Sequence, residues 1–155
     1  MAKNHAVFCH KLKIHAFEKE KKMQIFTSYF ANLKKLPPDT VPISIALKTP
    51  AWFSGMRYAP LAPTGEILSS WKVHRDNNLY LRQYNQTVLS RLDPMKVRKD
   101  LERLSGEKEV FLLCYERPED FCHRHRVAEW FSLCGIPVRE WGEEKKEEWE
   151  QLRLL

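Results

Sequence analysis

The sequence predicts a single α/β domain, Rossmann-like and three-layered, around a mostly parallel sheet. Residues 109–115 are a continuous apolar run, which is typical of a strand buried on both faces. A helical pattern follows this run, and a second β-prone segment covers residues 136–141. A strand, a helix and a strand within about 30 residues predict a βαβ unit with parallel strands and a right-handed crossover.

Length and composition favour one domain. The chain has 155 residues and 43% hydrophobic content, enough for one core rather than two. No window approaches ~18 consecutive apolar residues, and the first residues lack the pattern of a signal peptide. Four cysteines are too sparse for a disulfide scaffold. We therefore expect a cytoplasmic protein with reduced thiols and no membrane segment.

Residues 1–22 differ in character from the rest of the chain. They hold six lysines and two glutamates, so they contribute +4 of the net charge of +6. Cys9 and three of the six histidines also lie there, without the spacing of a four-ligand zinc site. We expect a basic, flexible extension over residues 1–22 and one α/β domain over residues 23–155.

The elements before the final unit follow from periodicity and turn residues. We expect, in order, strands at residues 24–30 and 41–47, a long loop at 48–65, and helices at 67–73, 78–92 and 94–104. Asp93 and Pro94 form a cap and first turn for the last of these helices, and Gly106 ends it.

The final unit places reactive residues at one turn. Asp120 is the expected N-cap of a helix from Phe121 to about Leu133, which Gly135 ends. Cys134 is expected on the apolar face of this helix. The charged tail over residues 143–155 has helical spacing of its apolar residues and predicts a terminal amphipathic helix.

Ligands of parallel sheets gather outside the carboxyl ends of strands, where helix N-termini favour anions. The turn from Cys114 to Arg124 lies at that edge. Arg124 can bind phosphate or carboxylate, and His123 can transfer protons near neutral pH. The field of the helix would lower the pKa of the Cys122 thiol. Glu116 adds a carboxyl group at the end of the strand.

Ordinary structural roles are the alternative. Cys114 would then be a small core residue, residues 122–124 exposed first-turn residues, and Glu116 a partner of a nearby base. Metal binding by Cys114, Cys122, His123 and His125 has poor ligand spacing and no C-x-x-C pair, so we assign no metal to the site. The Cys-x5-Arg, Walker and GxGxxG signatures do not occur.

The residues 112–118 (Leu-Leu-Cys-Tyr-Glu-Arg-Pro), 121–124 (Phe-Cys-His-Arg) and 127–130 (Val-Ala-Glu-Trp) resemble the C-terminal signature of the domain-of-unknown-function 488 family. Residues 25–29, 43–46 and Pro50 resemble a divergent branch of it. The more typical branch has Thr-Ile-Gly in its first strand and Asp-Val-Arg at the end of its second. This chain has residues 27–29 (Thr-Ser-Tyr) and 46–48 (Ala-Leu-Lys) there, which puts Lys48 at the basic position.

The resemblance covers residues 23–141 and implies a compact Rossmann-like fold. It implies a polar pocket formed by Thr27, Ser28, Lys48, Glu116, Cys122, His123 and Arg124. It implies no reaction.

Together these observations predict a small enzyme, a hydrolase or transferase, that acts on an anionic ligand such as a nucleotide, a modified base or a nucleic-acid end. Glu116, Cys122 and His123 are the candidate catalytic residues. The candidate ligand-binding residues are Thr27, Ser28, Lys48, Cys114 and Arg124. The sequence assigns no cofactor and no oligomeric state.

Two other functions fit the sequence. The first is a non-catalytic nucleic-acid-binding or adaptor module that uses residues 1–22 and the aromatic residues Trp52, Phe53 and Tyr58. The second is a metal-binding structural domain.

Overall fold

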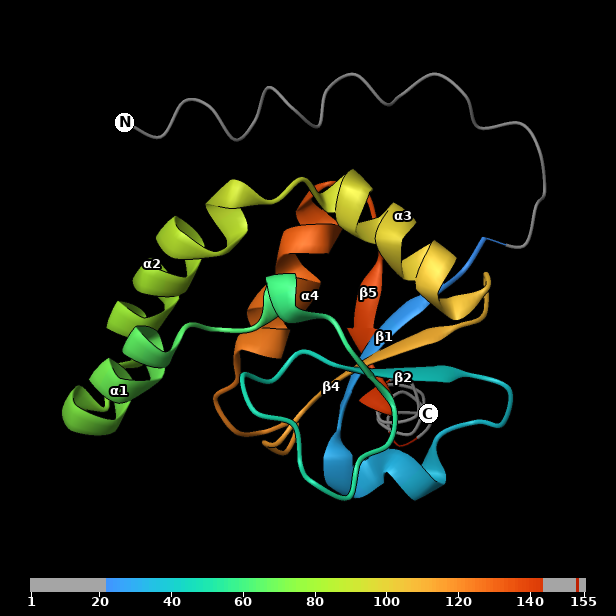
Figure 1. Cartoon of the computed structure of the whole chain (residues 1–155), viewed down its shortest axis with the longest axis horizontal. Coiled ribbons are helices and arrows are strands. Elements are labelled where there is room, and N and C mark those ends of the chain that lie inside the picture. The colour runs from blue at the N-terminus through green and yellow to red at the C-terminus, as the bar shows by residue number, and fades with distance from the viewer. Residues whose placement is uncertain (1–21, 144–152, 154–155) are drawn as a thin grey trace.

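The computed structural model describes residues 22–143 and residue 153. Five strands form one sheet in the order β3-β2-β4-β1-β5, and every neighbouring pair is parallel (Figure 1). They are β1 (Ile25–Tyr29), β2 (Val41–Ser44), β3 (Met56–Arg57), β4 (Val110–Cys114) and β5 (Val138–Glu140). The predicted α/β class with a parallel sheet is confirmed.

The expected βαβ unit is present, with one difference in topology. The chain runs from β4 through a helix to β5, but β1 lies between these two strands and pairs with both. The central strands have few exposed atoms, and all five residues of β4 are buried. This burial on both faces explains the uninterrupted apolar run in the sequence.

Four α-helices and three short 3₁₀ helices complete the described chain. The helices are α1 (Gly65–His74), α2 (Asn77–Thr87), α3 (Pro94–Ser105), α4 (His123–Leu133), η2 (Phe30–Lys35), η3 (Ala59–Leu61) and η4 (Leu89–Arg91). The predicted ends of α3 are confirmed. The Asp93 carboxylate accepts a hydrogen bond from the Met95 amide, and Gly106 has a φ of 61°, in the left-handed region that glycine enters without strain.

Two hydrophobic cores lie on opposite faces of the sheet. On one face, Leu112 belongs to a cluster with Leu101 of α3 and Phe131 of α4. On the other face, Phe26 stacks on Phe111 with ring centroids 5.2 Å apart. The alternation of side chains along each strand separates these two sets.

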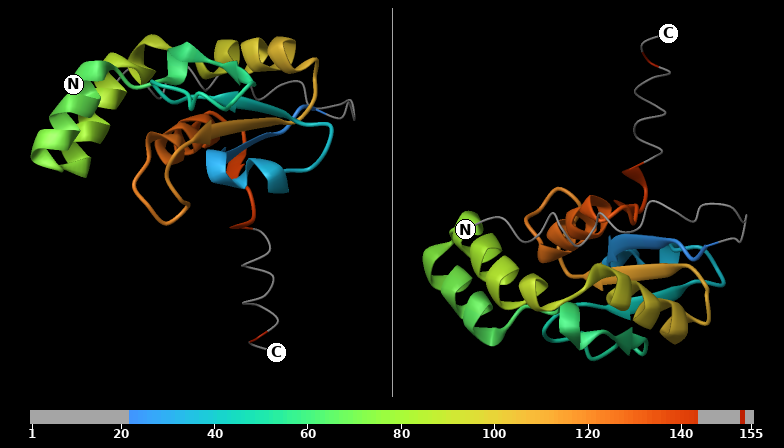
Figure 2. Two further views of the ribbon diagram at one scale, coloured as in Figure 1. Left: turned by 60° about the horizontal axis from the view of Figure 1, so that its bottom comes forward. Right: turned by 90° about the horizontal axis from the view of Figure 1, so that it is seen from above.

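α1 and α2 lie side by side at one end of the molecule, as the views of Figures 1 and 2 agree. The indole nitrogen of Trp71 donates a hydrogen bond to the side-chain oxygen of Asn77, which links the two helices. Tyr84 is fully buried, and its hydroxyl donates to the carbonyl of Leu61. The helix pair is therefore tied together and to η3, and it forms one wall of the site described below.

The start of α4 differs from the prediction. Asp120 is not the N-cap, because its amide donates to the carbonyl of Arg117 and closes a separate turn. Two further residues follow before the helix, so Cys122 takes the N-cap position and His123 is the first helical residue. The amides at the helix start therefore lie two residues later than expected.

Two other predicted elements are too long, and one residue is misplaced. β2 ends at Ser44 rather than at residue 47, since the Ser44 hydroxyl accepts from the Ala46 amide and from Thr49. The helix predicted over residues 78–92 ends at Thr87 and continues as η4. Cys134 is half-buried at the end of α4, outside both cores.

The expected extension and the terminal amphipathic helix lie almost entirely outside the described residues. In the part of the chain that is described, no helix has the length and apolar character needed to cross a membrane.

Candidate functional site

A pocket of about 370 Å³ opens at the carboxyl edge of the sheet, beyond β2 and β4. Three kinds of segment line it: the loops that follow the two strands, the start of α4, and the helix pair α1 and α2. Its lining comprises Ala46, Leu47, Lys48, Pro63, Gly65, Leu68, Ser69, Trp71, Lys72, Tyr80, Cys114, Tyr115, Glu116, Phe121, Cys122 and His123. This is the edge at which parallel sheets bind ligands.

Five of the eight predicted site residues line this pocket. They are Lys48, Cys114, Glu116, Cys122 and His123. The sheet explains their meeting, because β2 and β4 are adjacent and parallel, so the chain leaves both strands at the same edge. Cys122 and His123 then return to that edge at the start of α4.

His123 is held in one orientation between backbone and sulfur. Its Nε2 lies 2.8 Å from the Ile45 carbonyl oxygen, which can only accept, so Nε2 carries the proton. Its Nδ1 then faces two sulfur atoms, with the Sγ of Cys114 and the Sγ of Cys122 each 3.9 Å away. The ring is only 3% exposed. The imidazole is therefore positioned to exchange a proton with a thiol at Nδ1.

The hydrogen bond between the two thiols shifts their pKa values in opposite directions. Burial alone would raise the pKa of Cys122, but hydrogen bonds with Cys114 and His123 and the positive charges of His123 and Arg124 hold that pKa well below its ordinary value. The pKa of Cys114 is raised, first by its hydrogen bond with Cys122 and then by burial. The pair thus favours a thiolate at Cys122 and a thiol at Cys114.

Glu116 brings a half-buried carboxyl group to the pocket. Burial and the negative charge of Cys122 raise its pKa. Its Oε2 atom is inaccessible to solvent and has no hydrogen-bond partner among the described residues. A carboxyl group in this setting holds its proton at higher pH than an exposed one, which suits a general acid.

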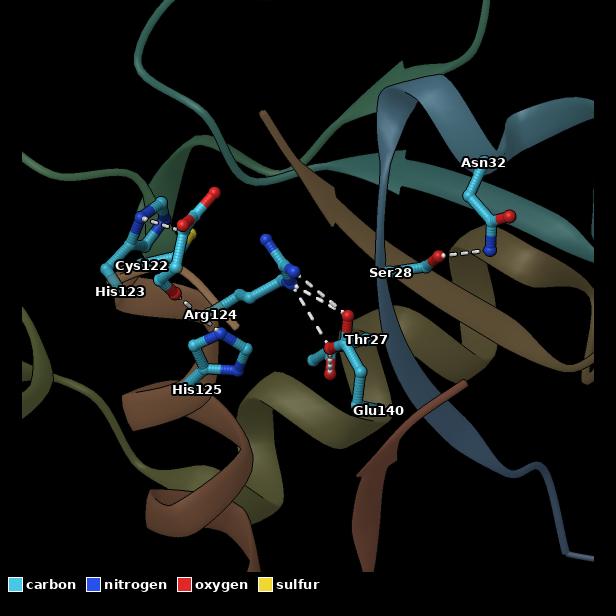
Figure 3. Close-up of polar contacts among 9 residues, drawn as sticks. Thr27, Ser28, Asn32, Cys122, His123, Arg124, His125 and Glu140 are labelled. Carbon is cyan, nitrogen blue, oxygen red and sulfur yellow. Dashed lines mark hydrogen bonds and ion pairs between the residues drawn. The ribbon is translucent and has the colours of Figure 1, made fainter. Parts of the chain in front are cut away.

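Arg124 does not line the pocket, contrary to the expectation that it holds an anion there. Its guanidinium forms an ion pair with Glu140, with Nη2 2.9 Å from Oε1, and Glu140 also accepts from the Thr27 hydroxyl at 2.6 Å (Figure 3). All three side chains are buried. Burial lowers the pKa of Arg124, but hydrogen bonds to Glu140 outweigh this effect and raise it.

Thr27 and Ser28 were also expected in the pocket, and neither lines it. Both are fully buried within β1, and the Ser28 hydroxyl accepts a hydrogen bond from Asn32. The sheet alternates side chains, so adjacent residues of one strand face opposite sides and only the residues beyond its end reach the edge. The interpretation of residues 122–124 as exposed first-turn residues is wrong, since all three are buried.

The sequence did not indicate the aromatic wall of the pocket. Trp71, Tyr80 and Phe121 line it, with Trp71 and Phe121 nearly parallel at an interplanar angle of 17°. Lys72 lines the same side. The sequence placed Trp71 and Tyr80 only within predicted helices, and the docking of the helix pair brings them to the pocket. Glu140 was also missed, although its place two residues after buried Val138 in β5 was a usable signal.

The aromatic loop proposed for nucleic-acid stacking is mostly internal. Phe53 and Tyr58 are buried, and the Tyr58 hydroxyl donates to Asp100. Trp52 is 64% exposed and is the one of the three available to a partner.

A parallel α/β sheet with a thiol, imidazole and carboxyl pocket at its carboxyl edge defines a Rossmann-like protein with a candidate active site. The family model of the active DUF488-N3 subclade matches residues 32–134, well over half of the chain. The chain therefore belongs to the DUF488 family, and the resemblance seen in its motifs is confirmed. Searches of the curated proteins and of the solved structures found no match.

Proposed function

We propose that the protein is a small enzyme, a hydrolase or transferase, that acts on an anionic ligand such as a nucleotide, a modified base or a nucleic-acid end. One observation carries the proposal: Glu116, which follows the end of β4, lines the same pocket as Cys122 and His123 at the start of α4. A nucleophile beside an oriented base and a separate acid is the minimum set for group transfer. The description of the matching subclade as active agrees with an enzyme.

The walls of the pocket support a ligand that joins an aromatic ring to a negative charge. Trp71, Tyr80 and Phe121 offer ring faces and edges on which a base can stack. Lys48 and Lys72 add two positive charges to the same lining, which would attract a phosphate. A nucleotide combines these two features.

In the proposed reaction the Cys122 sulfur forms a bond to an electrophilic carbon or phosphorus atom. The bond to the leaving group breaks, its electron pair departs with that group, and the Glu116 carboxyl supplies the proton. Water, or another acceptor hydroxyl, then gives its proton to the Glu116 carboxylate and displaces the sulfur. Water makes the enzyme a hydrolase, and another acceptor makes it a transferase.

His123 and Arg124 act on Cys122 in this proposal. His123 receives the thiol proton at Nδ1, because Nε2–H is committed to the Ile45 carbonyl. The buried positive charge of Arg124 favours the thiolate from behind the pocket, with Glu140 and Thr27 fixing its position. Arg124 is therefore a positioning residue and does not contact the ligand.

The ligand class is tested by thermal unfolding of the parent protein with nucleoside monophosphates and with inorganic phosphate. We expect a nucleotide to raise Tm, and the double variant Lys48→Ala/Lys72→Ala to bind at least about tenfold more weakly, since two charges near a phosphate are lost. Lys99→Ala is the matched control, because Lys99 is an exposed lysine outside the pocket. Equal Tm shifts in the parent and the double variant would contradict the assignment.

A further inference from the structure

We propose that Cys114, Cys122 and His123 bind one divalent transition-metal ion, zinc by preference, within the pocket. The two sulfur atoms and one ring nitrogen lie within 4.8 Å of one another. Thiolate and imidazole together form a donor set that suits zinc. Among the described residues, this is the cluster of three such donors that the fold brings together. The proposed metal site lies in the same pocket as the proposed active site. It depends on the proposed function only through this shared location.

The distances are close to those of a zinc site. Nδ1 of His123 lies 3.9 Å from each sulfur. Zn–S bonds of ~2.3 Å and a Zn–N bond of ~2.0 Å in a tetrahedron would place each sulfur about 3.5 Å from that nitrogen. Binding therefore requires a closure of a few tenths of an ångström, which small rotations of the two cysteine side chains can supply.

The orientation of His123 is a second and independent observation. Histidines that bind metals usually donate their other ring N–H to a carboxylate or a backbone carbonyl, which fixes the ring. His123 does so here, with Nε2 2.8 Å from the Ile45 oxygen. A histidine with only a packing role would need this bond, but not two thiols that face its remaining nitrogen.

The cluster supplies three ligands and leaves a fourth position open. Glu116 lines the pocket but does not belong to the group of mutually close donor atoms. Structural zinc sites have four protein ligands, whereas catalytic sites have three and a water. The arrangement thus corresponds to an open site that faces the pocket, not to a closed structural one.

Metal binding and the thiol reaction exclude each other, because a sulfur bound to zinc is not a free nucleophile. A metal held by Cys114, Cys122 and His123 would supply an activated water as the nucleophile, and Glu116 in the same pocket would serve as its base. Binding must also remove the proton from each thiol and leave Nδ1 bare.

The test uses the full chain after treatment with a chelator, titrated with Co²⁺ alone. We expect one equivalent to bind with an absorption band from thiolate-to-cobalt charge transfer, and Zn²⁺ to abolish the band. Cys114→Ser, Cys122→Ser and His123→Ala should each weaken binding at least about tenfold. Cys134→Ser and Cys9→Ser are the controls and should bind as the parent does, since Cys134 lies outside the cluster and Cys9 belongs to the basic extension.

X-ray absorption of the zinc-loaded parent keeps the test valid if a variant does not fold. Two sulfur ligands at ~2.3 Å with nitrogen or oxygen ligands would support the site. A different number of sulfurs, no charge-transfer band, or a band lost in Cys9→Ser but kept in Cys122→Ser would overturn it. The nucleotide experiment on chelated protein tests the proposed function without metal, so either idea can fail alone.

Discussion

Arg124 has the largest side chain among the fully buried residues of the described chain, and it carries a charge. An isolated buried guanidinium would cost several kcal/mol, so its pairing with Glu140 is a requirement of the fold. Its Cζ also lies 5.9 Å from the centre of the Tyr29 ring. The same residue adds positive charge beside Cys122. One buried cation thus serves both packing and the electrostatics of the site.

The buried ion pair predicts an asymmetric response to mutation. Arg124→Met should lower the free energy of unfolding by about 3–5 kcal/mol, because it leaves the Glu140 carboxylate buried without its cation. The double variant Arg124→Met/Glu140→Met should recover much of this loss, since neither charge remains. Urea unfolding measures both.

The matched control for this prediction is Arg126→Met, which removes a partly exposed pair with Glu129. We expect this variant to lose less than about 1 kcal/mol. Equal losses in Arg124→Met and the double variant would contradict a dominant role for the unpaired carboxylate.

The reactivity of Cys122 is a second prediction for single residues. In chelated protein, His123→Ala should slow alkylation of Cys122 by iodoacetamide. The hydrogen bond with Cys114 and the charge of Arg124 remain, but the hydrogen bond and the charge of His123, which also lower the pKa of Cys122, are lost. Peptide mass spectrometry measures the rate at each cysteine. His125→Ala is the control, since the His125 ring bonds to the Asp120 carbonyl and not to sulfur. A rate unchanged in His123→Ala, or slowed equally in both variants, would count against the thiolate assignment.

At the scale of elements, one of two predicted helix N-caps is correct and the other is wrong. Asp93 and Asp120 both precede apolar helical patterns, and the sequence favours each as a cap. Asp93 caps α3, whereas Asp120 closes a turn with Arg117 and stands two residues before the N-cap of α4. The local sequence pattern is similar at both aspartates. The segment between β4 and α4, however, forms a turn at Asp120 before the helix begins, and the sequence pattern does not show this turn.

The two aspartates give a matched pair of variants. Asp93→Ala should lower the free energy of unfolding by about 1 kcal/mol, because the Met95 amide loses its acceptor. Asp120→Ala should change it by less than about 0.5 kcal/mol, since that side chain caps no helix. Thermal or urea unfolding of both variants checks the difference, and a larger loss in Asp120→Ala would contradict the observed cap.

At the scale of the whole molecule, the pocket forms where separate segments converge at one sheet edge. The loop after β2 contributes Lys48, the end of β4 contributes Cys114, and the helix pair contributes Trp71. Among the described residues, those that line this pocket begin at Ala46. The charge that residues 1–22 carry can be tested by a variant that leaves every one of these lining residues unchanged.

A chain that starts at Met23 should keep the melting temperature and the nucleotide-induced Tm shift of the parent. The reason is that, within the described part of the chain, the pocket lining begins at Ala46 and the cores begin at Met23, which this variant keeps. Scanning calorimetry with and without a nucleoside monophosphate measures both. Loss of the shift at equal salt concentration would instead favour the nucleic-acid-binding module, in which the basic extension binds the polyanion.

The sequence by itself determined the α/β class, the strand at the end of which Cys114 lies, and the grouping of Glu116 with Cys122 and His123. Apolar periodicity and short spacing along the chain are local properties, so they can be recognised without coordinates. The sequence could not show that Thr27, Ser28 and Arg124 lie outside the pocket lining, because the direction of a side chain depends on which elements pack against it.

Tertiary structure decided the rest. The position of β1 between β4 and β5 places Thr27 beside Glu140. The Glu140 carboxylate in turn pairs with Arg124 in the interior. The end of β4 places the Cys114 sulfur near Nδ1 of His123, the same atom that the Cys122 sulfur approaches. The spacing of these residues in the sequence did not predict this arrangement. Strand order and helix docking bring distant residues together, and neither is written in any one segment of the chain.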